Sequence, residues 1–65
     1  MSKIERVKFL ARELWEIDNL SAAKLATENR WVVYTFNATH GVDLGQGLTE
    51  LDAWLDCIKS AVEAS

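Results

Sequence analysis

The chain has one cysteine, Cys57, and one histidine, His40, among its 65 residues. A lone cysteine cannot close a disulfide within the chain, and two soft ligands are too few for a structural zinc, which usually takes four. A domain of this size buries only about 60% of the surface that its unfolded chain exposes, so small folds often need a staple. The sequence therefore predicts a single domain over residues 1–65 that holds neither metal nor cofactor. Oligomerisation is left as the source of additional stability.

The composition indicates a folded protein. Hydrophobic residues make up 49% of the chain and the formal net charge is −3, a combination that argues against disorder. The longest uninterrupted apolar run, residues 31–34, is far shorter than a membrane span. The first twelve residues mix charged with apolar side chains, unlike a signal peptide. We expect a cytoplasmic protein with no membrane contact.

Two segments have the apolar periodicity of an amphipathic helix. The first covers residues 3–16 and opens with a capping box formed by Ser2 and Glu5. The second covers residues 50–63 and follows Thr49, a favourable N-cap residue. A third, shorter helix is predicted over residues 20–28, where good helix formers predominate.

Residues 31–36 are dense in β-branched and aromatic side chains and predict a strand that is apolar on both faces. A turn over residues 37–41 leads to a short second strand over 41–45. The predicted fold class is α+β, in the order helix–helix–strand–strand–helix, with a two-stranded antiparallel hairpin packed on the helices. The expected core consists of Val7, Leu10, Leu14, Val33, Leu51, Trp54, Leu55 and Ile58.

Residues 37–47 carry all three glycines and His40. The glycine spacing matches neither a P-loop nor a dinucleotide fingerprint, and Glu50 and Asp52 in the following helix would repel a phosphate. We interpret the glycines as turn residues at positive φ. His40 and Asp43 form a conceivable acid–base pair, but no nucleophile stands out beside them. We predict no catalytic site, because a chain this short is not expected to enclose a substrate pocket of about 300 Å³.

Residues 31–63 resemble part of the HicB-type antitoxin fold, in which G-x-T-x-x-E-A often stands where a helix begins. Gly47, Thr49 and Ala53 match this motif, and Asp52 replaces the glutamate. The similarity covers about half of the chain, and helices are expected where that fold has its first strand. The resemblance implies an antitoxin-like regulator.

These observations favour a small non-enzymatic module for protein–protein interaction or regulation, such as a phage or mobile-element accessory or inhibitor protein. The alternative is a regulator that binds a ligand or nucleic acid through residues 37–47 or the helix predicted over 20–28. Nucleic-acid binding is disfavoured because a DNA reader normally shows a clustered basic footprint. Residues 31–65 instead carry one basic and five acidic side chains.

Self-association is expected because some apolar residues do not fit a monomer. Phe9 falls within a charged helix face, and strand 31–36 has two apolar faces. We predict a symmetric homodimer in which this strand pairs edge to edge with its copy. The alternative is that helix 20–28 covers the second strand face within one chain. The residues expected to contact an unidentified protein or a second copy are Phe9, Trp15, Trp31, Tyr34, Phe36, Asn37, His40 and Asp43.

Overall fold

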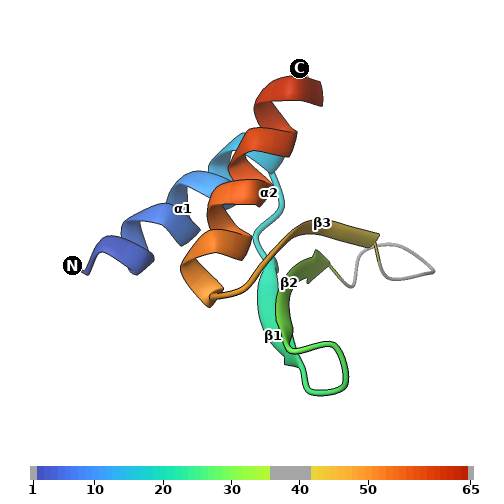
Figure 1. Cartoon of the computed structure of the whole chain (residues 1–65). Coiled ribbons are helices and arrows are strands. Elements are labelled where there is room, and N and C mark those ends of the chain that lie inside the picture. The colour runs from blue at the N-terminus through green and yellow to red at the C-terminus, as the bar shows by residue number, and fades with distance from the viewer. Residues whose placement is uncertain (1, 36–41, 65) are drawn as a thin grey trace.

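The computed structural model describes residues 2–35 and 42–64. Its elements are α1 (Lys3–Trp15), β1 (Ser21–Leu25), β2 (Arg30–Thr35), β3 (Val42–Gly47) and α2 (Glu50–Ala64). The strands form one antiparallel sheet in the order β1-β2-β3, and both helices lie on the same side of it (Figure 1). The α+β class is therefore confirmed, whereas the element order is helix, three strands, helix.

The helix predicted over residues 20–28 is wrong, because Ser21–Leu25 is strand β1 and pairs with β2. Alanine, lysine and leucine favour a helix by less than 1 kcal/mol per residue, and tertiary pairing overrides so small a preference. Asn29 adopts a φ of 50° in the turn between the two strands. Asparagine tolerates this left-handed conformation well, so Asn29 was the available signal for a hairpin.

The predicted boundaries of α1 are confirmed to within one residue. The Ser2 side chain accepts a hydrogen bond from the Glu5 amide at 3.3 Å, as the capping box requires. The helix ends at Glu16, which has a φ of 56°, and the Ile17 amide then donates to the Arg12 carbonyl at 3.1 Å. A non-glycine residue therefore occupies the left-handed position that usually favours glycine.

The other predicted elements also form. Thr49 accepts a hydrogen bond from the Asp52 amide at 3.1 Å and caps α2. The two predicted strands form as β2 and β3, with ends shifted by one or two residues. Because β2 is the central strand, both of its edges are already paired. The predicted edge-to-edge pairing of this strand with a second copy is therefore wrong.

Helix α2 lies unusually close to β3 because Gly45 and Gly47 have no side chains. A Cβ atom at Gly45 would lie 2.5 Å from both the Ala53 carbonyl oxygen and the Cys57 amide nitrogen. Neither glycine has a positive φ, so their interpretation as turn residues is wrong. Their role is to permit close helix–sheet packing. Gly41 lies outside the described residues.

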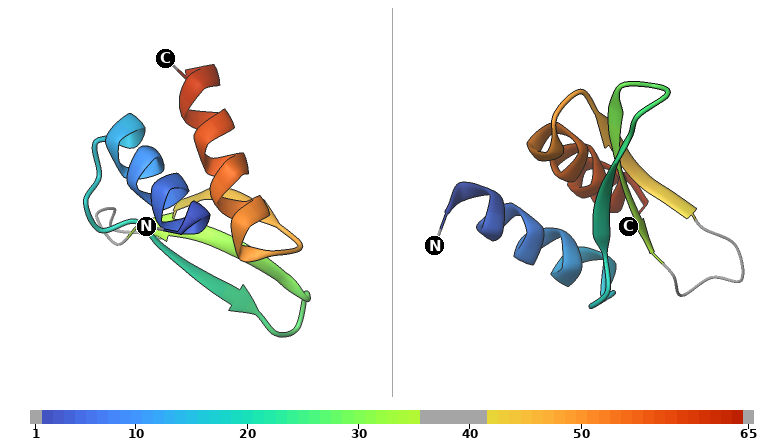
Figure 2. Two further views of the ribbon diagram at one scale, coloured as in Figure 1. Left: turned by 90° about the vertical axis from the view of Figure 1, so that its left-hand side faces the viewer. Right: turned by 90° about the horizontal axis from the view of Figure 1, so that it is seen from below.

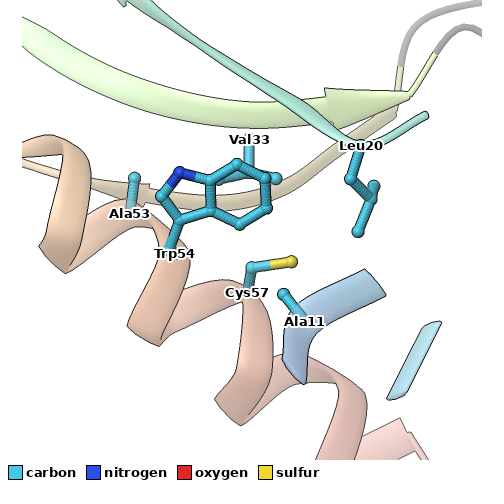
Figure 3. Packing of buried hydrophobic residues seen from close by; sticks show 6 residues of the cluster. All are labelled: Ala11, Leu20, Val33, Ala53, Trp54 and Cys57. Atoms are coloured by element: carbon cyan, nitrogen blue, oxygen red, sulfur yellow. The ribbon is translucent and has the colours of Figure 1, made fainter. Parts of the chain in front are cut away.

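The core forms where α2 meets the sheet and α1, and Trp54 is its largest member at 1% exposure. Figure 3 shows the Trp54 ring beside Val33 of β2, with Cys57 pointing toward Leu20 and Ala11. Val33 and Trp54 were predicted, and Val7 and Ile58 pack against this cluster. The cluster of fully buried residues is Ala11, Leu20, Val33, Ala53, Trp54 and Cys57.

Three predicted core residues are instead partly exposed. Leu10, Leu14 and Leu55 have exposed fractions of 48%, 44% and 45%. Helix α1 instead approaches the core through Ala11, and α2 approaches it through Trp54 and Cys57, with Ala53 against β3. Small side chains allow closer contact between backbones, and the larger leucines are left on the outer side.

Candidate functional site

The two helices run parallel and side by side, as two contacts between them show. The Lys8 ammonium lies 3.4 Å from the Glu50 carboxylate, near the start of α2. Further along, the Trp15 indole donates a hydrogen bond to the Cys57 carbonyl at 2.9 Å. Both contacts join residues that are 42 positions apart, so the helices keep the same register along this length. Figure 2 shows the pair on one face of the sheet.

A polar cluster on Trp54 fixes the rotation of the helices. The Lys8 and Arg12 cations lie 5.9 and 5.6 Å from the Trp54 ring centre, and the indole donates to Glu50 at 3.3 Å. Arg12 also donates to the Leu20 carbonyl at 3.0 Å, just before β1. These contacts turn the Arg12 side of α1 toward the sheet. The cations are held by cation–π and hydrogen-bond contacts, so we assign this cluster a structural role.

On α2, three consecutive residues lie at successive positions around the helix, from the side that faces the sheet to the side that faces solvent. Ala53 lies over β3, and Trp54 lies about 100° further around the helix, toward α1. Leu55 lies another 100° in the same direction, which takes it away from the sheet on the side of α1. Val62, seven residues later, shares this stripe.

On α1, three consecutive residues also pass from the sheet side to the solvent side, but in order of decreasing residue number. Arg12 reaches the sheet side, Ala11 is buried in the core, and Leu10 follows on the outer side. Leu14 lies four residues after Leu10 on the same stripe. Phe9 is one further step of about 100° around the helix, which places it on the flank of α1 opposite α2.

The outer stripes of the two helices therefore lie side by side along one seam as far as the end of α1, on the side away from the sheet, and Val62 continues the α2 stripe beyond that point. Their exposed fractions range from 44% at Leu14 to 59% at Val62. Scattered exposed leucines are normal, but a cluster of large aliphatic side chains on one surface is a candidate interaction site. We call this surface the helix face; it comprises Leu10, Leu14, Leu55 and Val62.

A separate open groove of about 300 Å³ lies between β3 and α2. The Asp56 carboxylate accepts a hydrogen bond from the Gln46 amide at 3.0 Å. This bond satisfies a backbone donor of the edge strand β3, which would otherwise be open to pairing with another strand. The groove is open to solvent and presents carboxylate and hydroxyl groups at its wall. The lining residues are Asp43, Leu44, Gly45, Gln46, Asp56 and Ser60.

The structure separates the residues predicted to form the interaction site. Phe9 is 61% exposed on α1, whereas Trp15 and Trp31 pack against the core and do not join it in an exposed patch. Tyr34 is half-buried in the central strand, and Asp43 lines the β3 groove. Phe36, Asn37 and His40 lie outside the described residues.

The sequence missed the helix face because its leucines were assigned to the core. Apolar periodicity identified one broad stripe on each helix, but it could not show which edge of the stripe the sheet would cover. The signal that could have found the helix face is the excess width of both stripes, beyond the roughly 100° arc that core packing needs.

The buried thiol of Cys57 has no chemical role that the geometry supports. Burial raises the pKa of Cys57 to about 11, so the thiol stays protonated at neutral pH and is a poor nucleophile. Over residues 2–35 and 42–64, no three His, Cys, Asp or Glu side chains gather into a possible metal site. Neither helix of this part of the chain is long and apolar enough to cross a membrane.

Comparisons with protein-family models, with curated proteins and with solved structures found no match to this chain. The resemblance of residues 31–63 to HicB-type antitoxins therefore stays an expectation from the sequence.

Proposed function

We propose that this chain is a small non-enzymatic protein-binding module that acts as a regulatory or inhibitory accessory protein. The observation that carries the proposal is the helix face, where four large aliphatic side chains are 44–59% exposed on one surface. Burying such a surface against another protein releases water from apolar groups, which is the main favourable contribution to protein association.

The charges beside the helix face support a protein partner over a nucleic acid. On the outer side of α1, Arg6 and Glu13 flank Leu10 at four and three residues; on α2, Asp52 and Lys59 flank Leu55. Each flank therefore carries charges of both signs. Nucleic-acid binding normally needs a cluster of positive charge that neutralises several phosphates.

The alternative of a ligand- or nucleic-acid-binding regulator has less support. The helix over residues 20–28, one of its two possible contact elements, does not form. Residues 42–47 of the other element form β3, where Asp43 adds a negative charge at the groove. We therefore retain this alternative only as an outcome of the experiment below.

Affinity capture with variants of the helix face tests the proposal. The tagged full chain is compared with Leu14→Glu and with Lys24→Glu, a control at an exposed position of β1. We expect a protein partner, which includes any untagged copy of the chain, to be retained by the wild type and the control and lost with Leu14→Glu. Circular dichroism establishes that each variant is folded. Equal retention by all three proteins, or recovery of nuclease-sensitive material only, would contradict the proposal.

A further inference from the structure

We infer that a second copy of this chain covers the helix face, forming a symmetric dimer in which α1 of each copy lies over α2 of the other. The inference rests on the proposed function of the helix face and adds the identity of its occupant. The two-fold axis runs along the seam, parallel to the helices. This arrangement places α1 and the partner's α2 in parallel, and a symmetric contact of this type closes at two copies.

Charge complementarity selects this arrangement. Arg6 and Glu13 are seven residues apart on the outer side of α1, and Asp52 and Lys59 are seven residues apart on the outer side of α2. All four residues are exposed within the single chain. The two-fold rotation about the seam brings these two sides together. Arg6 then faces the partner's Asp52, and Glu13 faces the partner's Lys59.

The register of the helices brings both charge pairs within reach. Contacts within the chain place residues that differ by 42 positions at the same height along the helices. Arg6 and the partner's Asp52 differ by 46 positions, as do Glu13 and the partner's Lys59. Each pair is thus offset by four residues, or about 6 Å along the helix axis, which extended arginine and lysine side chains can span.

Competing contacts within the chain do not prevent this pairing. Lys59 lies 4.0 Å from Glu63, but the Lys59 side chain is 74% exposed and such a surface pair is weak.

Lys24 provides a control for this interface, because it is exposed on β1, away from the helix face. Phe9 is unsuitable as a control. It is 61% exposed, but Glu13 follows it by four residues and therefore lies on the same side of α1. Lys24→Glu and Leu55→Glu therefore distinguish this dimer from contact through an edge of the sheet.

Sedimentation equilibrium of the full chain from about 5 to about 500 µM tests the inference. We expect the wild type and Lys24→Glu to approach twice the monomer mass of 7.3 kDa, and Leu55→Glu to remain monomeric. Glu13→Lys and Lys59→Glu should each weaken the dimer by about tenfold, since symmetry places each change in the interface twice. Combining both changes in one chain should restore most of the wild-type affinity. A monomeric wild type, or a double variant no tighter than the single ones, would overturn the inference.

A photo-crosslinking amino acid in place of Leu55 separates this inference from the proposed function. The same group in place of Lys24, on β1, serves as the control. Crosslinks from position 55 to a second copy support the dimer. Crosslinks only to a different protein would overturn the dimer and leave the proposed function standing. Crosslinks to nucleic acid, or none from position 55 above the control, would overturn both.

Discussion

Alanine at Gly45 should force β3 and α2 apart. The added Cβ atom would lie 2.5 Å from the Ala53 carbonyl oxygen and the Cys57 amide nitrogen, and 2.8 Å from the Cys57 Cα. All three atoms belong to the α2 backbone and cannot move as a flexible side chain would. The helix would have to withdraw by close to 1 Å before these contacts became acceptable.

Because the backbone conformation of Gly45 also suits alanine, steric contact alone decides whether the substitution raises or lowers the free energy of unfolding. Gly45 does not have a positive φ, so alanine could adopt the same backbone angles. Without the contacts to α2, Gly→Ala would stabilise the chain by about 0.4–1 kcal/mol, because alanine restricts the unfolded state. Overpacking a core usually costs about 1–3 kcal/mol, and a rigid backbone neighbour places this site at the upper end. We therefore expect a loss of about 2–3 kcal/mol, which is a large part of the roughly 3–5 kcal/mol that a core of this size supplies.

Urea unfolding followed by tryptophan fluorescence measures this loss. Gln46→Ala is the matched control, because its exposed side chain contacts only Arg30 among the described hydrogen-bond partners. That substitution should change the unfolding free energy by about 0.5 kcal/mol or less. A Gly45→Ala protein as stable as the wild type, or more stable, would refute the argument that glycine is required for this helix–sheet contact.

Three further substitutions test other parts of the structure. Burial raises the pKa of Cys57 from 9.0 in the unfolded chain to about 11. The protonated thiol therefore stabilises the fold below pH 9. We expect about 2 kcal/mol of the unfolding free energy to be lost as the pH rises from 9 to 11. Unfolding of Cys57→Ala over the same range gives the baseline, and parallel pH dependences would contradict the assignment. Glu16→Gly should raise the unfolding free energy by about 0.5–1 kcal/mol, because glycine accepts a φ of 56° without strain, and a lower stability would refute the reasoning. Trp15→Phe should lower the unfolding free energy by about 1–2 kcal/mol, because the Cys57 carbonyl loses the indole donor that lies 2.9 Å away. Trp31→Phe is the control for the smaller ring. An equal loss in both variants would count against a contribution from this hydrogen bond.

The elements that could be predicted are those whose signals are local. Capping at Ser2 and Thr49 marked both long helices, and the β-branched run of residues 31–36 marked the central strand. Strand β1 could not be recognised from composition, because its alanines and Lys24 favour a helix. It forms because β2 provides hydrogen-bond partners along its length, a long-range interaction that local propensity does not contain.

The rotation of each helix about its own axis could not be predicted from the apolar periodicity either. A stripe of apolar residues states which side of a helix is buried, but its centre shifts when small residues permit close approach. Gly45 and Ala53 bring α2 onto β3, and this contact turns Leu55 outward. The candidate interaction surface thus depends on residues that contribute almost no apolar area themselves. The charged pairs beside it are visible in the sequence, but their alignment follows only from the contacts between the helices.

Amide chemical shifts recorded over a concentration series test the central claim most directly. In ¹H–¹⁵N spectra of the full chain between about 10 µM and about 1 mM, we expect concentration-dependent shifts at Leu10, Leu14, Leu55 and Val62. The amide of Lys24 on β1 should not move. Shifts confined to the sheet edges, or spectra that do not change with concentration, would contradict the assignment of the helix face as the contact between two copies.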